Sequence, residues 1–348
     1  MDTPNSLSEV EKIKSKLQSA NLPANLHDKA SQQIDRIALS FKYGGNLSQL
    51  DITAKYIDWI TGLPWNTKTQ DMLDIRKTKE ILDKNHYGLE QIKQRVIEYL
   101  SVLIVQRQNL KTDSFHAPIL FFVGLTGTGK TTFAMSIAEA LGRKFARIPF
   151  GGLSSASDLR GQSKVTPEAE PGMVIRALRR TGAKNCVILL DELDRITPES
   201  HAEIMGVLVE LLDPEQNANF FDYFIDYPFD LSQVLFIATA NNTNNISTAV
   251  MDRLEIIQMP SYTDAEKITI AKNYVLPHYL KEVGLTTSNI QIDEAVWQRI
   301  TRPLGFDAGM RTLERTVEAI VRKTAFKIVN GQGTSFIINE NNIKEFLT

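Results

Sequence analysis

The stretch Ile119-Leu-Phe-Phe-Val-Gly-Leu-Thr-Gly-Thr-Gly-Lys-Thr131 decides how this chain of 348 residues folds. Its first five residues form a short apolar run between a proline and a glycine, which is typical of a parallel strand buried on both faces. The rest fits the pattern Gly-x-x-x-x-Gly-Lys-[Ser/Thr] at every fixed position. Residues 132–141 then continue as a helix that Gly142 ends. A strand, a glycine-rich loop and a helix in this order predict a phosphate-binding loop.

Each residue type in this loop has a physical reason to be there. Glycines let backbone N–H groups turn inward as an anion nest, and the helix N-terminus adds its positive dipole end. Lys130 supplies a mobile cation for the β- and γ-phosphates, and Thr131 offers its hydroxyl to Mg²⁺. The alternative, a glycine-rich turn with an incidental lysine, leaves the flanking strand and helix unexplained. The residues expected to bind the phosphates are Gly124, Leu125, Thr126, Gly127, Thr128, Gly129, Lys130, Thr131 and Thr132.

Two further apolar runs, at 187–190 and 234–238, lie between segments with helical patterns. Apolar runs that alternate with helices predict a doubly wound α/β domain with a parallel sheet and right-handed crossovers. We therefore expect the phosphate loop to belong to an α/β core.

Polar side chains follow both of these runs. Asp191 and Glu192 come directly after the first, where a strand's carboxyl end meets the ligand crevice. Asp191 can hold Mg²⁺ through water, and Glu192 can polarise an attacking water. Asn241 follows the second run and could orient water beside the γ-phosphate, although a loop asparagine that only makes turn hydrogen bonds is the alternative. An acidic strand end is common in isolation, but a phosphate loop about sixty residues upstream favours the catalytic interpretation.

The rest of the chain is predominantly helical. We expect helices over 8–42 with a break at 21–23, over 50–61, over two segments between 75 and 108, and over 264–282, 293–302 and 309–330. A turn at Gly44-Gly45-Asn46, a short strand within 332–339 and a last helix to Leu347 complete the pattern. This organisation predicts a helical arm (1–68), an α/β domain (69–260, with leading helices in 69–110) and a small, mostly helical domain (261–348).

Composition excludes several classes of protein. The formal net charge is −2, with 43% hydrophobic and 23% charged residues, which is ordinary for a globular chain and does not predict nucleic-acid binding. The single cysteine, Cys186, excludes a disulfide framework, and no apolar run approaches membrane-spanning length. We expect a soluble, cytoplasmic protein, with Trp59 and Trp65 used in packing. The histidines show no metal-ligand spacing: His27, His86, His116, His201 and His278.

Several segments together resemble the AAA+ ATPases and, among them, the Lon protease subfamily. They are Tyr56-Ile-Asp-Trp-Ile-Thr-Gly-Leu-Pro-Trp65, His86-Tyr-Gly-Leu-Glu-Gln-Ile-Lys93, Leu212-Asp-Pro-Glu-Gln-Asn217, Arg253-Leu-Glu and Gly309-Met-Arg-Thr-Leu-Glu-Arg315, in addition to the phosphate loop and the acidic pair. The resemblance covers residues 8–348. It implies a Mg²⁺-dependent ATPase whose small domain is a lid over the nucleotide, in a hexameric ring whose active sites lie at subunit interfaces.

The resemblance also implies roles for single residues. Lys130 and Thr131 correspond to the Walker A pair, and Asp191 and Glu192 to the Walker B pair. Asn241 takes the first sensor position, Arg253 that of an arginine finger acting on a neighbouring subunit, and Arg311 that of the second sensor. His86 and Tyr87 fall in the stretch that lies near adenine in the family. From chemistry alone, Arg253 and Arg311 are weaker candidates, since most arginines cover apolar surface.

Two departures from the family bear on function. Lon enzymes continue into a peptidase domain with a Ser–Lys dyad, and the sequence given ends at Thr348, so we expect no peptide hydrolysis from it. The family's aromatic–hydrophobic–glycine step, which grips substrate in the pore, corresponds here to Thr166-Pro167-Glu168. A flat aromatic ring grips any unfolded chain by area burial, and threonine loses most of that area. Pro167 or the neighbouring Val165 could substitute at reduced efficiency.

These observations leave a leading hypothesis and two alternatives. The leading one is a Lon-type motor that remodels or unfolds protein substrates, either as the motor half of a Lon enzyme in ATP-dependent proteolysis or as a stand-alone, chaperone-like ATPase. A separate peptidase is a possible partner. The first alternative is an ATP-controlled oligomeric scaffold or adaptor with little translocation, which Thr166-Pro167-Glu168 favours. The second, ATP-driven loading of nucleic acid, lacks support in the net charge of −2.

Overall fold

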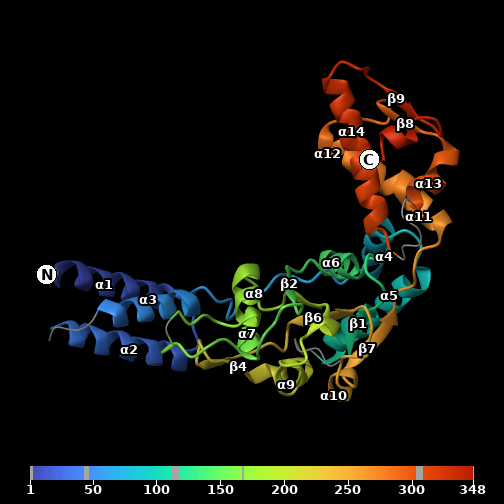
Figure 1. The fold of residues 1–348 in the computed structure, drawn as a ribbon. Coiled ribbons are helices and arrows are strands. Elements are labelled where there is room, and N and C mark those ends of the chain that lie inside the picture. The colour runs from blue at the N-terminus through green and yellow to red at the C-terminus, as the bar shows by residue number, and fades with distance from the viewer. Residues whose placement is uncertain (1–2, 43–46, 111–117, 167, 303–308, 348) are drawn as a thin grey trace.

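The computed structural model describes residues 3–42, 47–110, 118–166, 168–302 and 309–347. The turn predicted at Gly44-Gly45-Asn46 and residue Pro167 lie outside these ranges. The described chain is elongated and bent: three helices extend at the N-terminal end, a sheet with helices on both sides lies in the middle, and a small helical unit rises at the C-terminal end (Figure 1).

A five-stranded parallel sheet forms the centre of the molecule. Its order is β2-β3-β6-β1-β7, and all neighbouring pairs are parallel. The strands are β1 (Ile119–Val123), β2 (Phe145–Pro149), β3 (Val187–Asp191), β6 (Leu235–Ala240) and β7 (Leu254–Gln258). The predicted α/β class is therefore confirmed. The three apolar runs became the three inner strands, whereas the two edge strands, which expose part of their residues, were missed.

Each face of the sheet is covered by helices because successive side chains of a strand point to opposite faces. In β1, Leu120 and Phe122 pack with α4 (Ile75–Asn85), α5 (Glu90–Leu110) and α6 (Lys130–Leu141). Phe121 and Val123 belong to the core on the other face. That face carries α7 (Ser157–Arg160), α8 (Met173–Thr181), α9 (His201–Leu212) and α10 (Thr248–Met251), the hairpin β4 (Phe220–Asp222)–β5 (Tyr227–Phe229), and the 3₁₀ turns η1 (Leu193–Arg195) and η2 (Asn217–Asn219).

The N-terminal arm consists of α1 (Thr3–Ser19), α2 (Ala24–Lys42) and α3 (Leu47–Thr61). Its buried side chains are continuous with the core on the second face of the sheet. Trp65 packs against Tyr227 and Phe229 of the hairpin and donates its indole N–H to the carbonyl of Ile60 at 2.8 Å. The indole ring of Trp59 contacts Phe224 edge-on. These tryptophans therefore pack, as predicted, while the division at 68/69 and 260/261 remains a proposal.

The C-terminal unit has an apolar core of its own. It contains α11 (Asp264–Ile270), a π-helical turn η3 (Ala271–Val275), α12 (Leu276–Val283), η4 (Glu294–Val296), α13 (Trp297–Thr301) and α14 (Arg311–Val329). The predicted short strand is β9 (Phe336–Ile338), and its parallel partner β8 (Ile290–Ile292) was missed. The predicted last helix is wrong: this segment makes only the 3₁₀ turn η5 (Ile343–Glu345).

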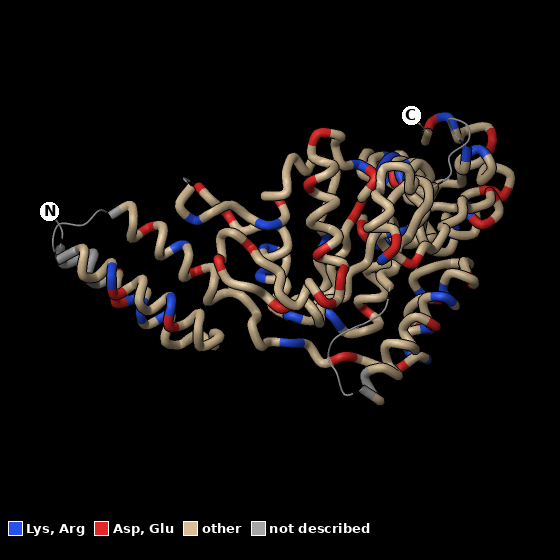
Figure 2. The backbone as a smooth tube through the Cα atoms, turned by 90° about the horizontal axis from the view of Figure 1, so that it is seen from below, with Lys and Arg blue, Asp and Glu red and all other residues tan. Residues whose placement is uncertain are grey.

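Charged residues of both signs alternate along the backbone (Figure 2). Among the described helices, none is long and apolar enough to cross a membrane. Nor do three or more His, Cys, Asp or Glu side chains gather as a metal site within the described part of the chain. Cys186 is buried as a small core residue, as predicted.

A buried ion pair ties the segment before α4 to the sheet. Arg143 donates two hydrogen bonds to the carboxylate of Asp71, at 2.8 and 2.6 Å, and a third to the carbonyl of Gln233 at 3.1 Å. Both side chains of the pair are 2% exposed. Breaking a buried ion pair by removing one partner is far more costly than losing an exposed pair.

We expect Asp71→Ala to lower the free energy of unfolding by about 3 to 5 kcal/mol. Urea denaturation followed by circular dichroism measures this change. The matched control is Asp35→Ala, which removes an exposed partner of Lys14 and is expected to cost less than about 1 kcal/mol. Equal effects of the two substitutions would contradict the assigned role of the buried pair.

His86 joins the end of α4 to α6. Its ring stacks on Phe133, with centroids 3.8 Å apart, and its Nε2 lies 2.9 Å from the hydroxyl of Ser136. The side chain is buried. Burial, and next the positive charge of Lys93, lower the pKa of His86 from 6.5 to about 4. His86 therefore stays neutral in the folded protein down to about pH 4, whereas the unfolded chain protonates this histidine near pH 6.5.

This pKa shift predicts a pH-dependent stability. Between pH 6.5 and 4 the unfolded state binds a proton on His86 and the folded state does not. The free energy of unfolding therefore falls as pH falls through this window. Relative to His86→Gln, the wild type should lose about 2 to 3 kcal/mol of unfolding free energy from pH 7.5 to pH 4.

Unfolding titrations of both proteins across this range measure the difference. Asp222, whose pKa burial raises to about 6, contributes with the opposite sign, but it is present in both proteins and cancels. The control His278→Gln alters an exposed histidine and should reproduce the wild-type profile. Parallel profiles for wild type and His86→Gln would rule out the buried, neutral histidine.

Candidate functional site

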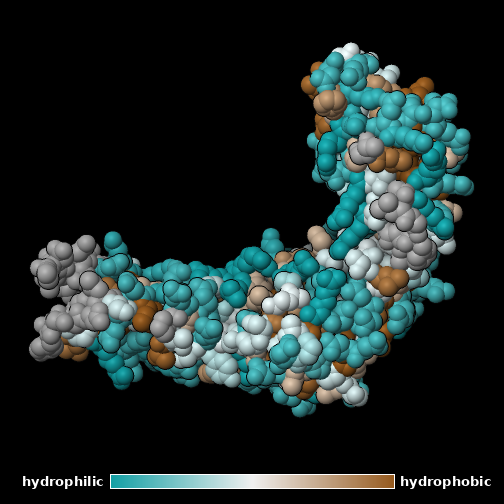
Figure 3. All heavy atoms as spheres, in the orientation of Figure 1, coloured by the Kyte–Doolittle hydropathy of each residue, from teal (hydrophilic) through white to brown (hydrophobic). Residues whose placement is uncertain are grey.

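A cavity of about 460 Å³ lies where the carboxyl ends of the strands meet the C-terminal unit. Register explains its position: Val123 pairs with Ala240, and Leu190 pairs with Ala238, so the carboxyl ends of β1, β6 and β3 share one edge of the sheet. The loops that follow these strands therefore converge. The surface on the concave side of the bend is mostly hydrophilic (Figure 3).

The loop after β1 forms one wall of the cavity. Gly127 and Gly129 have φ of +84° and +94°, a region that favours glycine. Gly124 has no room for a side chain, because a Cβ would lie 2.5 Å from the carbonyl oxygen of Met259. The residues of the predicted set that line the cavity are Thr126, Gly127, Gly129, Lys130, Thr131 and Thr132. Gly124, Leu125 and Thr128 are not among them; the buried Thr128 hydroxyl instead donates to the carbonyl of Leu125 at 2.9 Å.

Lys130 is held inside this loop. Its Nζ donates to the carbonyls of Gly124 and Leu125 at 2.5 and 3.0 Å and to Oδ1 of Asn241 at 3.2 Å. Burial lowers the pKa of Lys130, and the carboxylates of Asp191, Asp194 and Glu192 partly offset this. The ammonium group therefore faces an acidic cluster across a partly desolvated cavity, which strengthens its attraction for anions.

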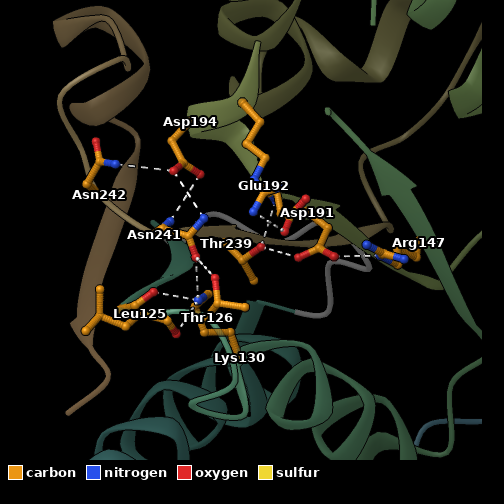
Figure 4. A network of polar contacts seen from close by, with 12 residues as sticks. Leu125, Thr126, Lys130, Arg147, Asp191, Glu192, Asp194, Thr239, Asn241 and Asn242 are labelled. Atoms are coloured by element: carbon orange, nitrogen blue, oxygen red, sulfur yellow. Dashed lines mark hydrogen bonds and ion pairs between the residues drawn. The ribbon is translucent and has the colours of Figure 1, made fainter. Parts of the chain in front are cut away.

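Asp191 ends β3, and both its carboxylate oxygens have partners (Figure 4). Oδ1 accepts a hydrogen bond from the hydroxyl of Thr239, and Oδ2 accepts one from Nε of Arg147 at 2.6 Å. Thr239 in turn accepts from the backbone N–H of Glu192 at 3.0 Å. Thr239 and Arg147 were missed by sequence reasoning. No sequence signal pointed to Thr239: its position beside Asp191 follows from the parallel register of β6 and β3, in which Leu190 pairs with Ala238.

Glu192 lines the cavity in an unusual backbone conformation. Its φ of +61° and ψ of 51° are left-handed, which costs a residue with a side chain about 1 to 2 kcal/mol. Its carboxylate lies 3.5 Å from the guanidinium of Arg195. Backbone strain of this kind concentrates at functional sites.

Asn241 is oriented by Asp194, a residue that the sequence analysis did not single out. Asp194 accepts from the backbone N–H of Asn241 at 3.1 Å and from its side-chain amide at 3.3 Å. The amide oxygen is thereby turned toward the loop, where it accepts from Lys130 and, at 3.2 Å, from Thr126. The sequence signal for Asp194 was its place three residues after Asp191, in the turn that follows β3.

The C-terminal unit closes the other side of the cavity. The backbone N–H of Met310 donates to the carbonyl of Gly127 at 3.0 Å, and the next residue, Arg311, begins α14 and lines the cavity. His86 and Tyr87 from the end of α4 also line it. An apolar and aromatic wall continues from them, built of Tyr262, Ile270, Tyr274, Val275 and Tyr279. Such a wall suits a flat heterocyclic ring.

Arg253 does not line this cavity. It directly precedes β7, whose first residue pairs with Ile119 at the start of β1. Arg253 therefore lies at the amino ends of the strands, whereas the cavity lies at their carboxyl ends. Its guanidinium donates to Asp213 at 2.8 Å and to the carbonyl of Ala249 at 2.7 Å. The hydrogen bond from Arg253 lowers the pKa of Asp213. The structure thus brings together every predicted catalytic side chain except Arg253.

The residues present fit a magnesium ion. Thr131 and Asp191 both line the cavity and offer a hydroxyl and a carboxylate, the hard oxygen donors that Mg²⁺ prefers. Two protein ligands are enough, because Mg²⁺ usually keeps several waters and takes substrate phosphate oxygens as further ligands.

Comparison with known proteins places this site in a family. Residues 120–262 match the model of the ATPase family associated with various cellular activities (AAA), and residues 281–336 match that of the Lon protease AAA+ ATPase lid domain. The chain is 41% identical to Lon protease 2 of Thermus thermophilus, 42% to Lon protease of Lawsonia intracellularis and 39% to Lon protease 1 of Bacillus subtilis. These matches cover 97% of this chain but 42%, 40% and 43% of the relatives.

The chain therefore spans about two fifths of the length of these relatives. The parts matched are the ATPase domain, which holds the phosphate loop and the acidic strand end, and the lid, whose match ends at residue 336. Fold, cavity and sequence agree, and the chain is an AAA+ ATPase module of the Lon protease family.

Proposed function

We propose that this module binds ATP with Mg²⁺ in the cavity and hydrolyses it. The observation that carries the proposal is the convergence of Lys130, Asp191, Glu192 and Asn241 on one cavity at the carboxyl edge of the sheet. A cation, an acidic pair and an amide around a glycine-rich loop are the parts that phosphoryl transfer to water requires.

Each residue has a task in this proposal. The loop amides and Lys130 hold the β- and γ-phosphates, and Glu192 accepts a proton from the attacking water. Asn241, with its amide oriented by Asp194, positions that water. Thr131 and Asp191 would hold Mg²⁺, which supplies charge neutralisation at the phosphate oxygens. His86 and Tyr87, with the aromatic wall of the lid, would receive the adenine ring, and Arg311 would contact phosphate oxygens from the lid side.

Arg253 fits a role in a neighbouring subunit. It lies at the amino ends of the strands, away from the cavity of its own chain, so it can act on a nucleotide only across a subunit interface. An arginine supplied in this way stabilises charge that develops in the transition state. This placement supports a homo-oligomer, and we propose the hexameric ring that the family resemblance implies.

We expect Glu192→Gln to reduce ATP turnover by at least about 100-fold, because general base catalysis contributes on this scale. Nucleotide affinity should change little, since the loop and Lys130 are intact. Steady-state phosphate release and binding of a fluorescent ADP analogue measure the two quantities separately.

The matched control is Glu199→Gln, the same change at an exposed position outside the cavity, which should retain full turnover. Turnover in Glu192→Gln equal to that of the wild type would dismiss Glu192 as the base. Loss of nucleotide binding in the same variant would show instead that Glu192 holds the site together.

We further propose that hydrolysis drives remodelling or unfolding of protein substrates in the cytoplasm. The support is the direct contact between loop and lid: Met310 donates to Gly127, so a change in the loop is passed to α14. The module would serve as the motor of ATP-dependent proteolysis, either as the motor half of a Lon enzyme or with a separate peptidase, or act alone in the manner of a chaperone.

One observation favours the alternative of an ATP-controlled scaffold or adaptor. Thr166 and Glu168 are exposed, and neither offers an aromatic surface to an unfolded chain. Glu168 has a φ of +59°, a conformation that glycine adopts at lower cost. Val165 is 80% exposed and is the large apolar side chain that this loop offers among its described residues.

A double substitution separates motor from scaffold. If this loop contacts substrate, Thr166→Tyr with Glu168→Gly should increase the stimulation of ATP hydrolysis by casein about two- to tenfold, because an aromatic ring buries more area on an unfolded chain. Phosphate release with and without casein measures the stimulation.

Glu168→Gly alone is the control for relief of the left-handed strain, and it should leave the response to casein near that of the wild type. If casein stimulates neither the wild type nor the double variant, the remodelling proposal fails and the scaffold becomes the better description. The ATPase assignment would stand in either case.

A further inference from the structure

Asp191 is held by two groups that come from different strands. Thr239 on β6 engages Oδ1, and Arg147 on β2 engages Oδ2 at 2.6 Å. In the close-up view, Arg147 approaches Asp191 from the side away from Lys130 and Asn241 (Figure 4). The carboxylate itself is 5% exposed, so both of its oxygens need partners.

The direction of the hydrogen bond between Thr239 and Asp191 follows from the single hydrogen that the Thr239 hydroxyl carries. Its hydroxyl accepts a hydrogen bond from the backbone N–H of Glu192, so its one O–H is available for donation elsewhere. Asp191 accepts it. Thr239 thus orients the carboxylate of Asp191 through Oδ1, and Oδ2 is the oxygen that pairs with a cation in this structure.

Arg147 is the cation at Oδ2. Lys130 donates to two loop carbonyls and to Asn241, and its direct contacts do not include Asp191. Within the described part of the chain, Arg147 is the ion-pair partner of Asp191. A nearly buried carboxylate without a counter-ion is costly, so this pair has a reason to exist apart from any ligand.

The guanidinium of Arg147 can leave at low cost when another cation takes its place at Asp191. Its side chain is 49% exposed and extends from β2, the edge strand of the sheet. A half-exposed arginine that lets go of a carboxylate regains full hydration, and pairs of this kind contribute little net free energy. Asp191 lines the cavity, so a cation bound there can take the place of the guanidinium.

We propose that Arg147 is a displaceable counter-ion of Asp191 that competes with the divalent cation for this carboxylate. Arg147 thereby sets the Mg²⁺ concentration at which the nucleotide site loads. The proposal rests on the proposed function in one respect, namely that Asp191 is a metal ligand. Arg147 acts on the metal site only through its ion pair with Asp191, so it is a competitor of the metal and not a catalytic residue.

The test measures binding of a fluorescent ADP analogue to the full chain across a range of free Mg²⁺ concentrations. The midpoint of the Mg²⁺-dependent change in affinity is the readout, and no turnover is needed. Mg²⁺ also binds the free analogue, but to the same extent in every sample, so differences between variants report on the protein.

We expect Arg147→Gln to shift the midpoint to about fivefold lower Mg²⁺, the factor that corresponds to loss of a half-exposed ion pair. Arg147→Lys should give an intermediate shift, because an ammonium group lacks the fork geometry of a guanidinium, and it keeps the test valid if the glutamine variant does not fold. The matched control, Arg180→Gln, removes an exposed arginine that reaches only the carbonyl of Arg147, at 3.5 Å, and should leave the midpoint unchanged.

An unchanged midpoint in Arg147→Gln, or a shift to higher Mg²⁺, would overturn the proposal; the second result would mean that Arg147 holds Asp191 in place for the metal. Asp191→Asn separates this failure from failure of the proposed function. If Asp191→Asn abolishes the Mg²⁺ dependence while Arg147→Gln does not alter it, Asp191 is a metal ligand and only the competition is wrong. If Asp191→Asn changes nothing, the metal assignment falls, and the role of Arg147 falls with it.

Discussion

The parallel pairing of β3, β6 and β1 is the constraint on which the site depends. Their carboxyl ends share one edge, so Asp191, Asn241 and the loop after Val123 meet although more than a hundred residues separate the first segment from the last. Because inner strands are buried on both faces, a shift of register by one residue would move every side chain from the core on one face into the core on the other, where it does not fit. The apolar core therefore holds the polar groups in place, and no local interaction of the site has to do so.

The polar groups at this edge satisfy one another. Lys130 is bonded to two carbonyls and an amide, Asn241 to Asp194, and Asp191 to Thr239 and Arg147. A network of this kind in a partly desolvated cavity is rigid when complete and costly when a member is missing. A phosphate group that enters the cavity must replace the present hydrogen-bond partners of Lys130 with its own oxygens. The site is therefore organised in advance for anionic charge.

The sequence predicted the parts of the structure that depend on local pattern. β1, β3 and β6 are continuous apolar runs, and the loop between β1 and α6 contains residue types that its chemistry requires. The edge strands β2 and β7 are not continuous apolar runs and carry charged residues such as Arg147 and Glu255, so they escaped recognition. Thr239, Asp194 and Arg147 act through neighbours on other strands or turns, and such contacts depend on register, which no local pattern in one sequence reveals.

The contact between lid and loop gives a physical route from nucleotide to motion. A Cβ on Gly309 would lie 2.3 Å from the carbonyl oxygen of Thr126, and Met310 donates to the carbonyl of Gly127, so the backbone that leads into α14 touches the loop. Loop amides that turn toward phosphate must carry these carbonyls with them, because each peptide unit is planar. The change then reaches Arg311 and the 19-residue helix behind it without an intervening flexible segment. Under the proposed function such a lid would move with the loop, and its core, separate from that of the sheet, would let it move as a unit.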